Sequence, residues 1–255
     1  MHLLIDIGNS TVVVATASNR GEIRDTCRFK TQKEETVSYY RNEILSGLGK
    51  CRIAVDQLNS VTISSVVPEV NDDVTQAVVD ITGIVPHFFS LADAKKIIKV
   101  DVESPLQLGN DRLADAVAAV SCYGVPVLVF DMGTATTVGV VDDTKTFRGG
   151  MIIPGVKTSL NALSKRASQL PAINIEKPRN IIGRNTLECM QSGTLYGTAA
   201  MVDGIIDRMV EILDYSVTVV ATGGMAKNII PFCRHKIVRD DFLQFKGIFC
   251  AAVKS

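Results

Sequence analysis

The 255-residue sequence is 46% hydrophobic and 21% charged, a globular composition whose length allows one large domain or two small ones. Its 27 basic and 27 acidic residues cancel, so no net charge points to nucleic acid or a membrane surface as a partner. No apolar run reaches the roughly 18 residues of a spanning helix, and no secretory pattern opens the chain, so we expect a cytoplasmic protein.

The cysteines and histidines exclude several kinds of site. The six cysteines (27, 51, 122, 189, 233 and 250) form no C-x-x-C pair, so we expect reduced, mostly buried thiols and not a disulfide or zinc framework. His2, His87 and His235 lie far apart in the sequence. They leave little from which to build a zinc site or a Ser-His-Asp triad.

The first hundred residues predict hairpin-connected strands followed by strands that alternate with helices. Residues 2–17 (HLLIDIGNSTVVVATA) have the pattern of strand, Gly-containing turn and returning strand. The further predicted strands are 22–31, 60–66, 86–90 and 97–102, and the predicted helices are 34–48 and a segment from Asn71 or Asp72 to Ile81 that ends at Gly83. This order is typical of an α/β fold of the ribonuclease-H-like kind.

Residues 104–122 predict a loop that becomes a helix. Asn110 is a plausible N-cap, and Asp111 falls in the first turn. An acidic residue there also favours the positive end of the helix dipole, and Arg112 can be an ordinary solvated charge. A functional role for Asp111 and Arg112 gains weight because this loop lies between two similar hairpins in the sequence.

The second of these hairpins is 126–142, PVLVFDMGTATTVGVVD. Such a turn can present backbone N–H groups and hydroxyls to an anion, with a carboxylate beside it to hold a cation. Alone, it could be an ordinary hairpin with a polar turn. Because Asp6 and Asp131 lie 125 positions apart, we expect two related domains, 1–115 and 116–255, that face a shared central cleft.

The remainder predicts a strand over 147–155, a helix over 156–169, a polar loop over 171–185 and a helix over 186–213. A strand at 217–222, a Gly pair, a helix from about Met225, a last strand, a turn at Gly247 and a short helix complete the chain. The Gly pair can approach a nucleobase or simply make a tight turn. Lys157 stands one residue too late after Gly150 and Gly155 for a P-loop, and we reject that motif.

Seven motifs resemble those of one family, the type III pantothenate kinases, within the acetate and sugar kinase, Hsp70 and actin superfamily. They are DIGNST (6–11), LGNDR (108–112), DMGTATT (131–137), GGMIIPG (149–155), LSKRASQLP (163–171), NTLECMQSGTLYG (185–197) and ATGG (221–224). The resemblance implies two ribonuclease-H-like domains and phosphorylation of pantothenate by ATP, the first step of coenzyme A synthesis. It also implies Mg²⁺ with ATP, a monovalent cation (K⁺ or NH₄⁺), and a homodimer whose substrate site is completed by the partner subunit.

The resemblance also implies roles for individual residues. Asp111 would be the general base, Asp6 would help to place magnesium through the phosphates, and Asp131 would hold the monovalent cation. The residues implied to bind ATP are Asp6, Ile7, Gly8, Asn9, Ser10, Thr11, Val12, Val13, Thr134, Gly223 and Gly224. The residues implied to bind pantothenate are Val102, Gly109, Asn110, Asp111, Arg112 and Thr186.

The sequence departs from the family pattern at two positions. Val102 stands where many members carry a tyrosine that lines the pantothenate pocket, and Asn110 stands where alanine is usual. Both departures concern the shape of the substrate pocket and not the chemistry.

Other functions remain open on the residues alone. A sugar or acetate kinase would share the two hairpins but not LGNDR with NTLECMQSG downstream. A regulatory actin-like protein could bind nucleotide without needing Asp111 and Arg112. An activator ATPase with a bridging iron–sulfur cluster is disfavoured, because no cysteine pair lies near a plausible interface motif.

Overall fold

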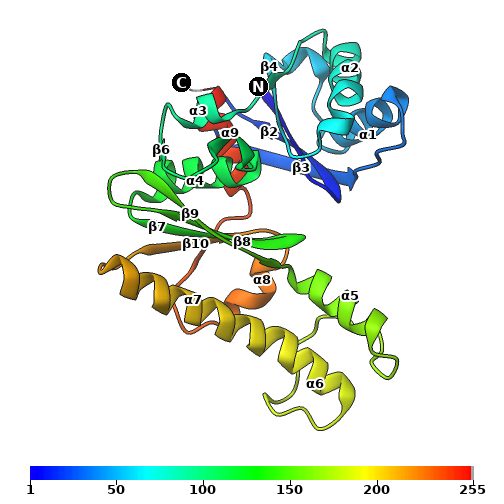
Figure 1. The fold of residues 1–255 in the computed structure, drawn as a ribbon. Coiled ribbons are helices and arrows are strands. Elements are labelled where there is room, and N and C mark those ends of the chain that lie inside the picture. Colours follow the sequence, from blue (N-terminus) through cyan, green and yellow to red (C-terminus); the bar gives the residue numbers. More distant parts are fainter. Residues whose placement is uncertain (254–255) are drawn as a thin grey trace. The chain divides into compact units, whose positions relative to one another are not determined.

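The computed structural model describes residues 1–253, except for the side chain of Asp25. The chain forms two compact units (Figure 1). Unit 1 comprises Met1–Cys122 and the C-terminal segment from Phe242, and unit 2 is Tyr123–Asp241. The division therefore differs from the expected boundary after residue 115. Helix α4 (Asn110–Tyr123) continues past that point, and the C-terminal helix α9 (Leu243–Ala252) returns to pack on the first unit.

Unit 1 contains a five-stranded sheet in the order β3-β2-β1-β4-β5. Strands β1, β2 and β3 are antiparallel neighbours, whereas β4 runs parallel to β1 and β5 runs parallel to β4. The strands are β1 (His2–Ile7), β2 (Thr11–Ala17), β3 (Ile23–Lys30), β4 (Ser60–Ser65) and β5 (His87–Phe88), with a short β6 (Lys99–Val100) outside this sheet. The helices are α1 (Val37–Lys50), η1 (Val55–Gln57), η2 (Pro68–Val70), α2 (Asn71–Thr82), α3 (Leu91–Ala94), η3 (Pro105–Gln107), α4 and α9.

Unit 2 repeats this topology with the strand order β9-β8-β7-β10-β11. Again three strands are antiparallel neighbours and two continue the sheet in parallel. The strands are β7 (Val127–Met132), β8 (Ala135–Val141), β9 (Thr146–Pro154), β10 (Thr218–Thr222) and β11 (Val238–Arg239). The helices are α5 (Val156–Arg166), α6 (Thr186–Ser192), the π-helical η4 (Gly193–Gly197), α7 (Thr198–Leu213), α8 (Ala226–Ile229) and η5 (Ile230–Phe232). The prediction of two ribonuclease-H-like domains is confirmed.

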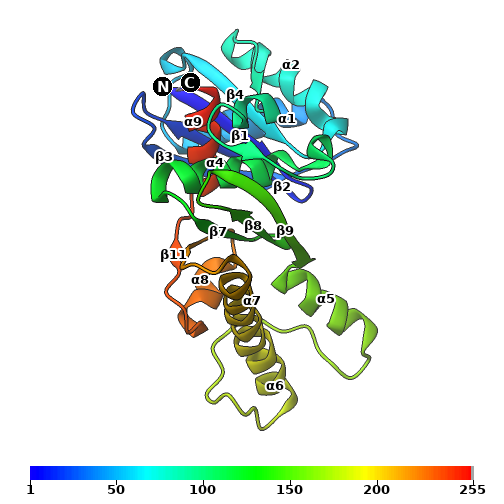
Figure 2. The same cartoon turned by 60° about the vertical axis from the view of Figure 1, so that its left-hand side comes forward.

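Each unit buries its own apolar core. In unit 1, fully buried residues of β1 such as Leu3 and Ile5 pack with Tyr40 and Ile44 of α1 and with residues of α2. In unit 2, α7 and α8 lie on one side of the sheet that contains β7 and β8 (Figure 2). Their apolar residues form a cluster with residues of these strands. The apolar runs of the hairpin strands, most of whose residues are buried, are the feature that made these strands predictable.

Several helix ends differ from the prediction. Helix α2 begins after the 3-10 turn η2, so Val70 holds the N-cap position that we expected at Asn71 or Asp72. Its predicted end is confirmed, because Gly83 adopts a left-handed conformation with φ of 68°. Helix α5 ends at Arg166 and not at 169, and the π-helical η4 interrupts the long helix expected over 186–213.

The turn predicted at Gly247 is wrong, because this residue lies within α9. A Cβ atom at Gly247 would lie 1.8 Å from the carbonyl oxygen of Ala114 in α4. The glycine therefore allows two helix backbones to touch, and a glycine that serves packing is easily mistaken for a turn.

Two features of the structure concern the expectations about membrane spans and about the cysteines. Within residues 1–253, no helix has both the length and the apolar character that crossing a membrane requires. All six cysteines are free thiols, but the expectation that most are buried is wrong, because Cys122 and Cys189 are exposed and the other four are only partly buried.

Candidate active site

The first phosphate-type turn joins β1 to β2 in unit 1. The Gly8 N–H donates to the Thr11 carbonyl oxygen at 3.0 Å, which closes the turn. From β3's end, the Thr31 hydroxyl donates to the Gly8 carbonyl oxygen at 2.6 Å. Asn9 and Ser10 are exposed at the tip. The turn is thus fixed from two sides while its tip stays open to solvent, as an anion-binding turn requires.

Asp6 precedes this turn and is only partly buried. In the sheet it lies beside Val13 of β2 and Ser64 of β4. One of its carboxylate oxygens, Oδ1, accepts a hydrogen bond from Nε2 of Gln244 in α9 at 2.7 Å. A carboxylate at the end of a strand, held by a neutral amide, is suited to bind a hard cation or its water ligands.

The LGNDR segment reaches the same end of the unit 1 sheet. The Asn110 amide nitrogen donates to the carbonyl oxygen of Ser65 at 3.3 Å, and Ser65 is the sheet neighbour of Ile7. Asn110 is not the N-cap that we predicted. It is the first residue of α4, and the Gly109 carbonyl oxygen accepts the Leu113 N–H at 3.2 Å. The amide of Asn110 is used for a tertiary contact instead of a cap.

The carboxylate of Asp111 has a defined orientation. Its Oδ1 accepts a hydrogen bond from the backbone N–H of Arg112 at 2.7 Å. A Cβ atom at Gly109 would lie 2.4 Å from this same oxygen, so a side chain at 109 would displace the carboxylate. Burial lowers the pKa of Arg112, and the negative charge of Asp111 opposes that shift. The result is a carboxylate and a half-buried guanidinium next to each other at the start of α4.

In unit 2, three of the motifs converge on the second turn. A Cβ atom at Gly223 would lie 2.4 Å from Oδ1 of Asp131, and φ at this glycine is 87°. Next to the same turn, the Gly155 N–H donates to the Thr134 carbonyl oxygen at 3.2 Å. The Thr158 hydroxyl donates to that oxygen at 2.7 Å. DMGTATT, GGMIIPG and ATGG therefore form one site around Asp131 and the exposed Thr134.

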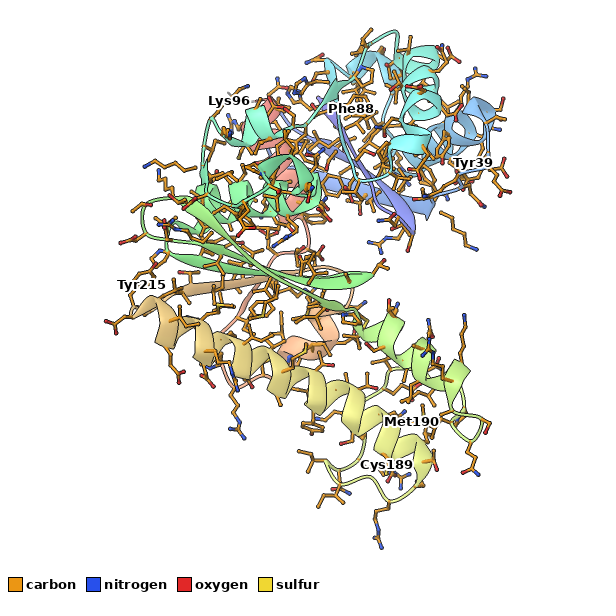
Figure 3. All side chains as sticks on the ribbon, in the orientation of Figure 1. Tyr39, Phe88, Lys96, Cys189, Met190 and Tyr215 are labelled. Atoms are coloured by element: carbon orange, nitrogen blue, oxygen red, sulfur yellow. The ribbon has the colours of Figure 1, made fainter. Side chains whose placement is uncertain are left out.

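Thr186 lies on the wall of a cavity of about 820 Å³ in unit 2, which Thr136 and Pro154 of the motifs around the second turn also line. The cavity lies among β9, α5, α6 and η4, and Cys189 and Met190 of α6 line it (Figure 3). The start of α6 is firmly held, because the Asn185 side chain accepts the Glu188 N–H at 2.9 Å. Most of the cavity wall is apolar, with Leu160, Leu163 and Leu170 among its residues.

A second cavity in unit 2, of about 500 Å³, lies beside the helix that follows the Gly pair. Tyr196 and Phe232 stand edge to face on its wall, with ring centroids 4.9 Å apart. Lys227 and Asn228 of α8 line it as well. An aromatic wall beside an amide and a cation suits a flat, polar ring such as a nucleobase.

The carboxylate of Asp6 fits a nucleotide-bound magnesium. Within residues 1–253, no three His, Cys, Asp or Glu side chains cluster as metal ligands. Mg²⁺ usually takes one or two carboxylates and otherwise keeps water and substrate phosphates as ligands. Asp6, beside an anion-binding turn, provides that kind of ligand.

The structure thus groups most predicted site residues within each unit, with two exceptions. Val102 is half-buried in the segment after β6, outside the strand expected there. Gly224 is exposed, and only its neighbour Gly223 packs against Asp131. Sequence reasoning missed Gln244. No local signal marks it, since it is separated from Asp6 by 238 positions.

Two ribonuclease-H-like units, each with a carboxylate before a Gly-containing turn, define an α/β protein of the ribonuclease-H-like fold class. Residues 2–208 match the sequence profile of the type III pantothenate kinases. The chain belongs to this family.

Individual relatives agree with this assignment. The chain is 34% identical to the type III pantothenate kinase of Halalkalibacterium halodurans, with 97% of each chain covered. It is 32% identical to that of Sulfurihydrogenibium sp., with 98% of each covered. Component A of (R)-2-hydroxyglutaryl-CoA dehydratase from Acidaminococcus fermentans has a similar fold, with a TM-score of 0.58, 14% identity and coverage of 100% and 96%.

The function follows from the family. The protein phosphorylates pantothenate with ATP and a divalent metal, the step that yields 4'-phosphopantothenate in coenzyme A synthesis.

Proposed function

We propose that Asp111 is the general base that accepts the proton of the pantothenate hydroxyl. The observation that carries this proposal is the fixed carboxylate at the start of α4, at the same end of the sheet as the turn after Asp6. The hydroxyl oxygen forms a bond to the γ-phosphorus while the bond to the β,γ-bridging oxygen breaks and ADP leaves. The released proton passes to a carboxylate oxygen of Asp111. Phosphoryl transfer mainly requires such positioning and charge stabilisation.

ATP would be held by residues of both turns. The proposed phosphate-binding residues are the turn and flanking strand positions Asp6, Ile7, Gly8, Asn9, Ser10, Thr11, Val12 and Val13, with Thr134 from unit 2. Asp6 would help to place magnesium through the phosphates, and the ion when bound would neutralise phosphate charge. The proposed adenosine site is Gly223–Gly224 with the adjoining cavity of Tyr196, Phe232 and Asn228. Its support is the aromatic wall next to that turn.

Asp131 would hold a monovalent cation, K⁺ or NH₄⁺. The support for this role is the partly buried carboxylate on which three motifs of unit 2 converge. A cation there would offset the charge of the carboxylate and of nearby phosphates.

Pantothenate would be bound by Gly109, Asn110, Asp111 and Arg112, with Val102 and Thr186 completing the site. The guanidinium of Arg112 is half-buried and suits the pantothenate carboxylate, which needs a charge-assisted partner. Valine at position 102 would give the pantothenate pocket a wall that is smaller than a tyrosine would give and purely apolar.

We also propose that two copies of the chain form a homodimer and that the partner completes the substrate site. Large apolar side chains are exposed on β9, α5, α6 and the loop before α6: Ile152, Leu163, Ile181, Ile182 and Leu187. Such grouped exposure is typical of an interface. Sedimentation should therefore give the mass of a dimer.

Mixing two inactive variants tests the shared site. Suppose that Thr186 of one subunit and Asp111 of the other belong to the same substrate site. Refolded mixtures of Asp111→Asn and Thr186→Ala should then recover part of the activity, because each mixed dimer contains one intact site. No recovery from mixtures that contain mixed dimers would contradict a site built by both subunits.

The preference for pantothenate and the proposed potassium requirement are tested by an ATP-consumption assay on pantothenate, pantetheine, glucose and acetate, with and without K⁺. We expect activity on pantothenate that requires K⁺. Equal rates without any monovalent cation would contradict the role of Asp131. We propose a cytoplasmic location for the enzyme, where ATP is supplied.

A further inference from the structure

Gln244 is the second residue of α9, and its side chain points toward Asp6, near the turn that joins β1 to β2. Its Nε2 donates to Oδ1 of Asp6 at 2.7 Å, and both side chains are partly buried. Within unit 1 this is a contact between the last helix of the chain and its first strand. Helix α9 lies across β1 and β4.

The position of Gln244 is fixed by its neighbours. Leu243 and Phe245 on either side are 0% and 6% exposed, so they anchor the first turn of α9 in the core. One turn later, Gly247 brings the helix against the backbone of Ala114 in α4. Helix α4 is the helix that begins with Asn110 and Asp111. A single short helix thus contacts both Asp6 and the helix of the proposed base.

We propose that Gln244 is a positioning residue for Asp6, orienting its carboxylate toward nucleotide-bound magnesium. The inference rests on the magnesium-placing role proposed for Asp6. It adds a residue that no motif contains and explains why α9 belongs to unit 1: the helix fixes Asp6 relative to α4.

An amide is chemically suited to this task. It donates an N–H to one carboxylate oxygen and carries no charge, so the negative charge that attracts the cation is retained. A lysine or arginine at 244 would neutralise Asp6 and compete with magnesium. Partners that orient a metal-binding carboxylate typically change metal affinity 10- to 100-fold when they are removed.

The test is the binding of Mn²⁺–ADP to the full-length protein, followed by the electron paramagnetic resonance signal of free Mn²⁺. Gln244→Met keeps the length of the side chain and removes the donor, and we expect its dissociation constant to rise roughly tenfold. The matched control is Cys250→Ala at the other end of the same helix, which should bind as the wild type does. Thermal unfolding of each variant separates a binding defect from a folding defect.

A double-mutant cycle with Asp6→Ala shows whether Gln244 acts through Asp6. We expect Gln244→Met to add no further loss in the Asp6→Ala background. Wild-type affinity in Gln244→Met, or an equal loss with and without Asp6, would overturn the inference and leave the role of Asp6 intact. Wild-type affinity in Asp6→Ala alone would overturn both.

Discussion

Asp6 and Asp131 hold the same position in the two units: each is the fifth residue of the six-residue strand that begins the β-hairpin of its unit. Each pairs with an antiparallel neighbour, Val13 or Thr137, and with a residue of a parallel strand, Ser64 or Thr222. Their surroundings differ. Asp6 accepts an amide hydrogen bond from α9, whereas Asp131 is packed against the backbone of a Gly turn. The same backbone arrangement thus provides the two carboxylates for which we propose two different cations.

The proposed cation site at Asp131 predicts a change in potassium dependence. Asp131→Asn should lose most of the stimulation by K⁺, because a neutral amide attracts the ion much more weakly than a carboxylate does. The measurement is the turnover rate against KCl, with choline chloride holding the ionic strength constant. Asp143→Asn, at an exposed position, is the matched control. An unchanged KCl activation curve in Asp131→Asn would rule out this role.

The hairpins were predictable because their signals are local. An apolar run, a Gly-containing turn and a β-branched run all fall within about fifteen positions, and together they predicted β1–β2 and β7–β8. The assignment of Asp111 and Arg112 to the start of a helix was local too. The family motifs then supplied roles that no pattern of spacing contains.

The errors arose where a distant contact decides the structure. Asn110 looks like a cap, yet its amide bonds to Ser65, which is 45 positions away. Gly247 looks like a turn, yet it serves contact with α4. Gln244 carries no signal at all. Tertiary contacts of this kind override local preferences and cannot be read from one sequence.

If Arg112 binds the pantothenate carboxylate, Arg112→Ala should raise KM for pantothenate far more than KM for ATP. Loss of a charge-assisted partner typically costs about 2 kcal/mol, which corresponds to roughly a 30-fold rise. Steady-state kinetics with each substrate varied in turn measures both constants. Arg41→Ala, in an exposed position of α1, is the control. Equal rises in both KM values would indicate a structural role for Arg112.

Asp142 should contribute to stability in a pH-dependent way. Burial alone would raise its pKa, but hydrogen bonds from Thr144, Thr146 and Arg148 outweigh burial and lower the pKa to about 2. Because the folded-state pKa is lowered, the stabilisation is complete above the unfolded value of about 4 and is lost as the pH falls toward 2.

The corresponding variant is Asp142→Asn, whose free energy of unfolding at pH 7 should be lower by roughly 2 kcal/mol. The difference from the wild type should shrink as the pH falls from 4 to about 2. Denaturant unfolding at a series of pH values gives both quantities. A difference that stays constant down to pH 2 would show that the charge of Asp142 is not the cause.

The contact between α9 and α4 predicts that Gly247→Ala is destabilising. The new methyl group would meet the Ala114 carbonyl, which is backbone and cannot rotate away. We expect a loss of about 1–3 kcal/mol in the free energy of unfolding, the usual range for overpacking. Gly49→Ala is the control, because it lies in α1 with nothing within 4 Å and should be neutral or stabilising. Equal stabilities for the two variants would contradict the close helix contact.

The most direct test of Asp111 as the general base is the turnover number of Asp111→Asn at saturating ATP and pantothenate. Asparagine can still accept the Arg112 N–H at Oδ1, so the fold and the start of α4 should be preserved, as circular dichroism and sedimentation would show. We predict that kcat falls at least about 100-fold, because the amide cannot accept the hydroxyl proton. A folded variant that turns over at a near-normal rate would contradict the assignment of Asp111 as the base.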